Sequence, residues 1–100
     1  MQIVDVRPSS RQGKRYMAEM SDGTKIHFGL KGGNTYLDHG NKKLREAYIL
    51  RHYGNAIEKK LIDNLIPSPS LFSMYLLWSL ANPAVKTLEG NVKLLNNMLE

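Results

Sequence analysis

The stretch KRYMAEMSDGTKIHFG, residues 14–29, decides the fold class, because it has the pattern of two short strands joined by a turn. Along Lys14 to Met20, one face carries Tyr16, Ala18 and Met20 and the other carries Arg15, Met17 and Glu19. Along Thr24 to Gly29, Ile26 and Phe28 alternate with Lys25 and His27. A period of two is typical of a half-buried strand, so we predict an antiparallel β-hairpin over residues 14–30.

The turn of this hairpin fixes how the two strands pair. A two-residue Asp22-Gly23 turn would place apolar side chains opposite polar ones. A three-residue loop, Ser21 to Gly23, instead pairs Tyr16 with Phe28 and Ala18 with Ile26, which keeps one face apolar. We therefore predict the three-residue loop, with Gly23 in the left-handed conformation of a bulge.

The segments on either side of the hairpin are rich in turn residues. Residues 1–13 are predicted to form a loose lead-in or an edge strand: 7–13 have the composition of a polar turn, and Gln2–Val6 would be the third strand. After the hairpin, residues 29–34 contain three glycines and a lysine. The spacing of a nucleotide-binding phosphate loop is absent, so a turn that leaves the sheet is the favoured interpretation over a phosphate-binding nest.

Residues 41–99 carry helical patterns. We expect helices over 42–53 (capped by Asp38 or Asn41), 56–65, 71–80 (capped by Ser70) and from Thr87 through Leu99. In the first of these helices Leu44, Ala47 and Tyr48 cluster at helical spacing, with Leu50 close by. The apolar side chains expected to pack inward in the second and last helices are Ile57, Leu61 and Leu65, and Leu88, Val92, Leu95 and Leu99. In the last helix, Asn91 and Asn96 are expected to face outward. The prediction is an α+β fold, a hairpin of two or three strands packed with three or four short helices in one domain, residues 1–100.

Composition limits the classes of protein that the chain can represent. With 100 residues and no cysteine, it is long enough for one thin core and has no disulfide framework or thiolate metal site. The net charge of +5 is uneven: residues 1–60 hold twelve Lys/Arg and six Asp/Glu, whereas residues 61–100 hold two and three. The longest nearly apolar stretch, residues 71–81, is far shorter than the roughly 20 residues that cross a bilayer, so we expect no membrane span.

No grouping of side chains matches a catalytic or metal-binding pattern. The three histidines, His27, His39 and His52, do not have the HxxxH or HExxH spacing that places two ligands on one helical face. Asp38 and His39 are sequence neighbours and are interpreted as a hydrogen-bonded pair at the start of a helix. We therefore expect no enzymatic activity, no metal and no cofactor.

Two surfaces are candidates for contact with partners. The first is the basic helix, where Lys42, Lys43, Arg45 and Arg51 would meet an acidic protein surface or, as the second choice, the phosphates of a nucleic acid. The second is the apolar segment 71–81, which is too apolar to be covered on every side by a small domain. There we predict that Leu71, Phe72 and Tyr75 reach a protein partner while Leu77 and Trp78 fill the core.

An ordered set of short motifs resembles a viral family. Asp22-Gly23, His27-Phe28-Gly29, Gly32, Tyr36 with Asp38-His39, Tyr48-Ile49-x-Arg51-His52 and Leu76-Leu77-Trp78 together resemble a small uncharacterised domain of large double-stranded DNA viruses and of viruses of aquatic microbes. The resemblance covers about residues 14–85. It departs from the family at residues 53–58. Members often carry a Glu and a Trp in this segment, whereas no tryptophan stands between residues 53 and 58 here.

The resemblance implies a viral origin and no known enzymatic activity. Together with the basic helix and the apolar segment, it leads us to expect a structural protein, a minor capsid or virion protein that bridges larger capsid subunits. The expected partners are capsid subunits or other virion proteins, and the expected location is the virion, with host cytoplasm during assembly. A basic nucleic-acid-binding or genome-packaging protein is the alternative.

Overall fold

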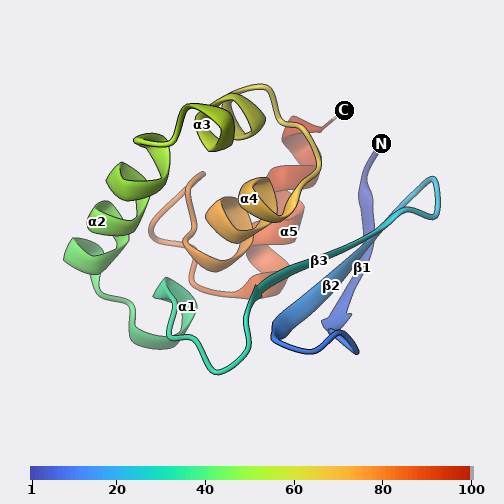
Figure 1. The fold of residues 1–100 in the computed structure, drawn as a ribbon, viewed down its shortest axis with the longest axis horizontal. Helices are drawn as coiled ribbons and strands as arrows, with labels where there is room; N and C mark the ends of the chain where they lie inside the picture. The colour runs from blue at the N-terminus through green and yellow to red at the C-terminus, as the bar shows by residue number, and fades with distance from the viewer. Residues whose placement is uncertain (100) are drawn as a thin grey trace.

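A three-stranded antiparallel sheet followed by helices forms the molecule, and the prediction of an α+β fold is confirmed (Figure 1). The computed structural model describes residues 1–99. The strands are β1 (Ile3–Pro8), β2 (Lys14–Met20) and β3 (Lys25–Leu30), in the order β1-β2-β3. The helices are α1 (Tyr36–His39), α2 (Lys42–Tyr53), α3 (Ala56–Asp63), α4 (Pro69–Phe72) and α5 (Leu88–Met98), with a π-helical segment η1 (Ser73–Leu77) after α4.

The hairpin has the predicted register. Tyr16 pairs with Phe28 and Ala18 pairs with Ile26, so the apolar side chains share one face. Gly23 has φ +89°, and the N–H of Met20 donates to the carbonyl of Thr24 at 2.8 Å across the loop. The three-residue loop with a left-handed Gly23 is therefore confirmed.

The third strand is also present, and it is longer than predicted. β1 pairs antiparallel with β2 and includes Arg7 and Pro8, so the prediction that 7–13 is a loose turn is wrong for its first two residues. Pro8 lacks an N–H, but it lies at the end of an edge strand, where that loss is tolerated. On the outer side of β1, the side-chain amide of Asn96 accepts from the N–H of Ile3 at 2.8 Å and donates to its carbonyl at 2.9 Å. These bonds tie α5 to β1 and explain why Asn96 does not face solvent.

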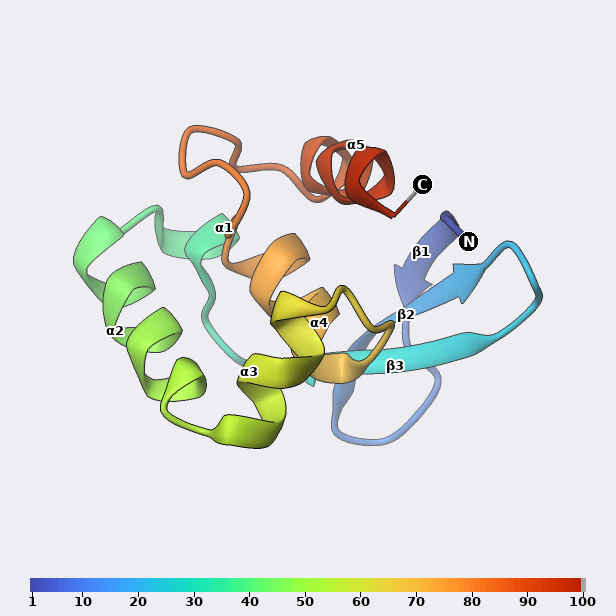
Figure 2. The ribbon, with the colours of Figure 1, turned by 90° about the horizontal axis from the view of Figure 1, so that it is seen from above.

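The segment that was expected to be one helix over 71–80 is instead a short α-helix that widens into a π-helix, and it is central (Figures 1 and 2). It begins at Pro69, because Ser68 rather than Ser70 accepts the capping bond from the N–H of Leu71. The sheet, α3 and α5 all contact the segment. Leu71 and Phe72 are 0 % exposed and Tyr75 is 8 % exposed, so the prediction that these three side chains form an exposed docking face is wrong.

In the helices around this central segment, the residues that are buried differ from those predicted to pack inward. α2 has its predicted bounds, but Leu44, Ala47 and Leu50 are exposed, and the helix meets the core mainly through Tyr48, Ile49 and Tyr53. In α3 the buried residue is Ile62, whereas Ile57, near the start of the helix, is 75 % exposed and does not pack inward as predicted. In α5, Leu95 is buried as predicted, but so is Asn91, whose amide donates to the carbonyl of Leu76 and to the hydroxyl of Ser79.

Candidate functional site

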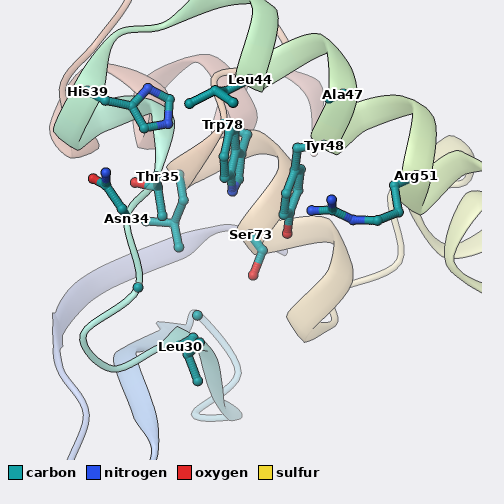
Figure 3. A pocket seen from close by; sticks show the side chains of 13 residues that line it. Leu30, Asn34, Thr35, His39, Leu44, Ala47, Tyr48, Arg51, Ser73 and Trp78 are labelled. Atoms are coloured by element: carbon teal, nitrogen blue, oxygen red, sulfur yellow. The ribbon is translucent and has the colours of Figure 1, made fainter.

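A groove lies between α2, the turn that follows β3, and the end of η1. It has a volume of about 410 Å³ (Figure 3). We call it the α2 groove. Its lining consists of Leu30, Leu44, Ala47, Tyr48, Arg51 and Trp78, together with Gly29, Gly33, Asn34, Thr35, His39, Ser73 and Leu77. A volume of this size lies within the range of about 300–1,000 Å³ that is usual for ligand-binding pockets. The groove is therefore the first place to look for a function.

The floor of the groove is an aromatic stack that belongs to the core. The rings of Tyr48 and Trp78 lie 4.0 Å apart, centre to centre, at an angle of 8° (Figure 3). The ring of His52 lies 4.1 Å from that of Tyr48, and the ring of His39 meets Trp78 edge-on at 5.5 Å. Burial raises the pKa of the Tyr48 hydroxyl above its usual value. The predicted place of Trp78 in the core is confirmed, and its ring also forms part of the groove.

Arg45 holds this floor against α2 and does not belong to the basic surface. Its Nε donates to the carbonyl of Trp78 at 3.0 Å, and its Nη2 donates to the carbonyl of Ser79 at 3.0 Å. These carbonyls follow the end of η1, where Ser79 has φ +51° and the chain leaves helical geometry, so no helical N–H is available to them. The prediction that Arg45 contacts a partner is wrong, because its guanidinium is used inside the domain.

The rim of the groove is apolar and basic. Leu30 is 70 % exposed and Leu44 is 50 % exposed, and the side chains of Lys42, Lys43 and Arg51 are also at the surface. The guanidinium of Arg51 lies over the ring of Tyr48, 5.6 Å from its centre. None of the groove-lining residues is an aspartate or glutamate. The groove therefore presents positive charge beside exposed leucine side chains.

A smaller hollow of about 260 Å³ adjoins the groove and shares Gly29, Leu30, Tyr48 and Ser73 with it. Its lining adds Lys14 and Glu58. The carboxylate of Glu58 is already used, since it pairs with Nδ1 of His52 at 3.1 Å and accepts from the hydroxyl of Ser70. The two hollows thus form one depression along α2.

His39 contributes a polar atom that has no partner inside the protein. Its Nδ1 accepts from the N–H of Asn41 at 2.8 Å, so the proton of the neutral ring is on Nε2. That Nε2 is buried and has no hydrogen-bond partner. An unpaired buried donor costs about 1–3 kcal/mol, and because this atom has almost no accessible surface it is not a contact point for a ligand in the groove.

Asp38 has a structural role apart from its neighbour. Both of its carboxylate oxygens accept from the guanidinium of Arg15 at 2.8 Å, and the carboxylate also accepts from the N–H of Thr35. The bond with Arg15 holds the pKa of the Asp38 carboxyl well below its usual value. Asp38 therefore fastens the first turn of α1 to β2 and does not form the predicted pair with His39.

The histidines do not converge. His27 contacts the hydroxyl of Ser9 at 2.6 Å, His52 contacts Glu58, and His39 lies in the groove wall. Among residues 1–99, no group of three or more His, Asp or Glu side chains is placed to hold a metal ion. In the same part of the chain, no helix is both long enough and apolar enough to span a membrane.

Sequence reasoning identified part of this site. Arg51, Lys42 and Lys43 are at the surface as predicted, but Leu30, Leu44 and Ala47 were not recognised as the exposed wall of a groove. A signal was present: α2 carries apolar residues over more of its circumference than one core-facing stripe requires. Leu30 lies between Gly29 and the glycines at 32 and 33, and no predicted strand or helix was expected to cover its side chain.

Comparison with known proteins gives one partial match. Residues 4–52 match the model of a family described as "Family of unknown function (DUF5754)". That range contains the sheet except Ile3, together with α1 and all but the last residue of α2, so it includes one wall of the groove but not Leu77 or Trp78. No curated protein and no solved structure matches the chain.

Proposed function

We propose that the chain is a structural interaction protein, a minor capsid or virion protein of a large DNA virus that bridges larger capsid subunits and receives one of them in the α2 groove. It works in the virion, after assembly in the host cytoplasm, without enzymatic activity. The viral setting rests on the resemblance of the ordered motifs from Asp22-Gly23 to Leu76-Leu77-Trp78. The contact itself rests on the groove.

The observation that carries the proposal is the exposure of apolar side chains around a hollow of about 410 Å³. Leu30 and Leu44 stand at its rim, where a compact domain of this size gains nothing by exposing them together. Contiguous exposed apolar surface with a polar edge is typical of protein-binding sites.

A specific observation disfavours nucleic acid as the ligand of the groove. Binding of unpaired bases relies on open aromatic faces. Here Tyr48 is covered by Trp78 at 4.0 Å and by His52 at 4.1 Å, and Trp78 is itself buried, so the groove has no free ring face for a base. Lys42 and Lys43 on the surface would still attract phosphates, which predicts weak binding that is sensitive to salt.

Photo-crosslinking tests the proposal. The photoreactive residue p-benzoylphenylalanine is placed at Leu44, on the rim of the groove, and in a control chain at Met98, an exposed position on α5. Both chains are produced during infection, and the particles are purified and irradiated. The Leu44 chain should be found in particles and should crosslink to a capsid subunit, whereas the Met98 chain should not give the same product. Absence from particles, or crosslinks from Leu44 to DNA alone, would overturn the proposal.

A further inference from the structure

We infer that the α2 groove recognises an acidic segment of its partner that carries one bulky apolar side chain, such as Leu, Phe, Met or Trp, beside its Asp or Glu residues. This inference rests on the proposed function, because it takes the ligand of the groove to be a protein segment. It adds the chemistry by which that segment would be selected.

The need for a bulky apolar side chain follows from the walls. Leu44, on α2, and Leu30, at the end of β3, lie at opposite ends of the hollow, and the Tyr48–Trp78 stack lies between them (Figure 3). Leu30 is among the most exposed large apolar residues of the described chain, at 70 %. An apolar side chain inserted here would remove both leucines from water, and the rigid stack would give it a fixed surface to pack on.

The preference for acidic residues follows from the charges. Lys43, Ala47 and Arg51 are spaced by four residues on α2, so they form one row along the helix, and Ala47 and Arg51 of this row line the groove. Within residues 1–99, neither Lys43 nor Arg51 belongs to any ion pair formed by the side chains. The groove lining contains no carboxylate. An acidic ligand would therefore find cations that are not already neutralised.

The adjoining hollow extends the same preference along the depression. Lys14 is in its lining and likewise belongs to no ion pair among the described residues, while Glu58 is engaged by His52. A segment that lies along α2 would thus meet Arg51 in the groove and Lys14 in the adjoining hollow, with the apolar side chains of Leu30 and Leu44 beside them. An acidic segment with a central apolar residue has the complementary pattern.

A peptide selection tests the inference with the full chain. A random peptide library displayed on phage is selected on the wild-type protein and, in parallel, on Arg51→Glu. The wild-type chain should enrich peptides with Asp or Glu next to a bulky apolar residue, and the variant should fail to enrich them. Enrichment of basic or uncharged peptides, or no enrichment beyond that of the variant, would overturn the inference.

The enriched peptide is then titrated into the protein while the fluorescence of Trp78, the only tryptophan of the chain, is measured. Because Trp78 lines the groove, its emission should change when the groove is filled. Combining Lys43→Glu with Arg51→Glu should weaken binding about ten-fold or more. The control, matched in charge to the single variant Arg51→Glu, is Lys60→Glu, an exposed charge reversal on α3 that lines neither hollow, and it should change binding by less than about two-fold where Arg51→Glu weakens it by more. Equal weakening by both variants would mean that net charge, and not the groove, governs binding.

These outcomes are separable from those of the proposed function. If the Leu44 crosslink reaches a capsid subunit but its attached segment is basic or uncharged, the proposed function holds and the acidic ligand is wrong. If acidic peptides bind the groove but the protein is absent from particles, the binding chemistry holds and the virion role is wrong.

Discussion

Replacing Arg45 by alanine should destabilise the domain by about 3 kcal/mol, although the sequence presents this residue as one of several cations on a basic helix. The magnitude follows from two hydrogen bonds of its guanidinium, to the carbonyls of Trp78 and Ser79, each 3.0 Å long. A hydrogen bond with a charged partner contributes about 1.5–3 kcal/mol. We take the lower value for each, because Arg45 is half-buried and water would reach part of the vacated space. A third contact, to the carbonyl of Leu80 at 3.5 Å, is too long to add.

The measurement is urea unfolding followed by the fluorescence of Trp78. This tryptophan lies beside the carbonyls that Arg45 binds, so its emission reports the region that the substitution perturbs. The unfolding midpoint should fall while the slope of the transition stays the same, because the same surface is exposed on unfolding. In thermal unfolding, a loss of about 3 kcal/mol corresponds to a fall of about 12 °C or more for a domain of this size.

The control is Lys43→Ala, on the same helix. Lys43 is exposed and forms no ion pair within residues 1–99, so its loss should change stability by no more than about 0.5 kcal/mol. Equal stability of the two variants would refute the assignment of Arg45 to the interior of the domain. It would restore the interpretation that Arg45 belongs to the surface that meets a partner.

Three further predictions concern the core, the sheet and the response to acid. Phe72→Ser should unfold the protein, since emptying a fully buried aromatic site costs about 3–5 kcal/mol, and a soluble, folded variant by circular dichroism would contradict the central position of α4. Gly23→Ala should cost about 1 kcal/mol from backbone strain alone, whereas Gly29→Ala should cost more in the same denaturation assay, because its new Cβ would also meet a Leu77 methyl at 3.0 Å. Asp38→Asn should lower stability at about pH 7 by about 1 kcal/mol by removing the pair with Arg15, discounted for partial exposure. Because the pKa of Asp38 is lowered in the folded state, its contribution is complete above the ordinary pKa of the carboxyl, about 4, and is lost progressively as the pH falls towards the lower pKa of the folded state. The difference between wild type and variant in urea unfolding should therefore be smaller at about pH 2 than at about pH 7.

The parts of the fold that could be predicted are those that neighbouring residues decide. The hairpin register follows from a period of two and from Gly23, whose φ of +89° few other residues adopt. The bounds of α2 follow from Asn41, whose side chain accepts from the N–H of Lys43 and Leu44, and from Gly54. Thr87 caps α5 in the predicted way, by accepting from the N–H of Gly90. Each of these signals acts within three or four residues, so the sequence alone contains it.

The parts that could not be predicted depend on partners far along the chain. Asn91 and Asn96 have the composition of an outward face, yet one binds the carbonyl of Leu76 and the other binds both backbone groups of Ile3. Arg45 and Lys43 are both cations on α2, and only the position of Ser79 and its neighbours distinguishes them. A polar side chain is buried when it pairs with a backbone group that would otherwise lack a hydrogen-bond partner, and the residues next to it in the sequence do not reveal that pairing.

The error at residues 71–81 has a different origin. The segment is apolar on nearly every side, and the prediction assumed that a small domain could not cover it. The structure covers it because the sheet, α3 and α5 contact it from different directions (Figure 2). The exposed apolar surface instead belongs to α2, where Leu44 and Leu50 face solvent.

The residues of the groove that affect stability differ from those that would affect ligand specificity. Its floor, the Tyr48–Trp78 stack, is core, so substitutions there would alter stability before they altered specificity. Its rim, with Leu30, Leu44 and Arg51, is exposed, so substitutions there would change the ligand while leaving the fold intact. α2 itself has no fully buried residue and is held to the core mainly by the aromatic stack and by Arg45. Helices with little buried surface open more readily than the rest of a domain. A partner segment in the groove would contact both α2 and Leu30, and so would fasten this helix to the sheet by the same contacts that give the segment its affinity.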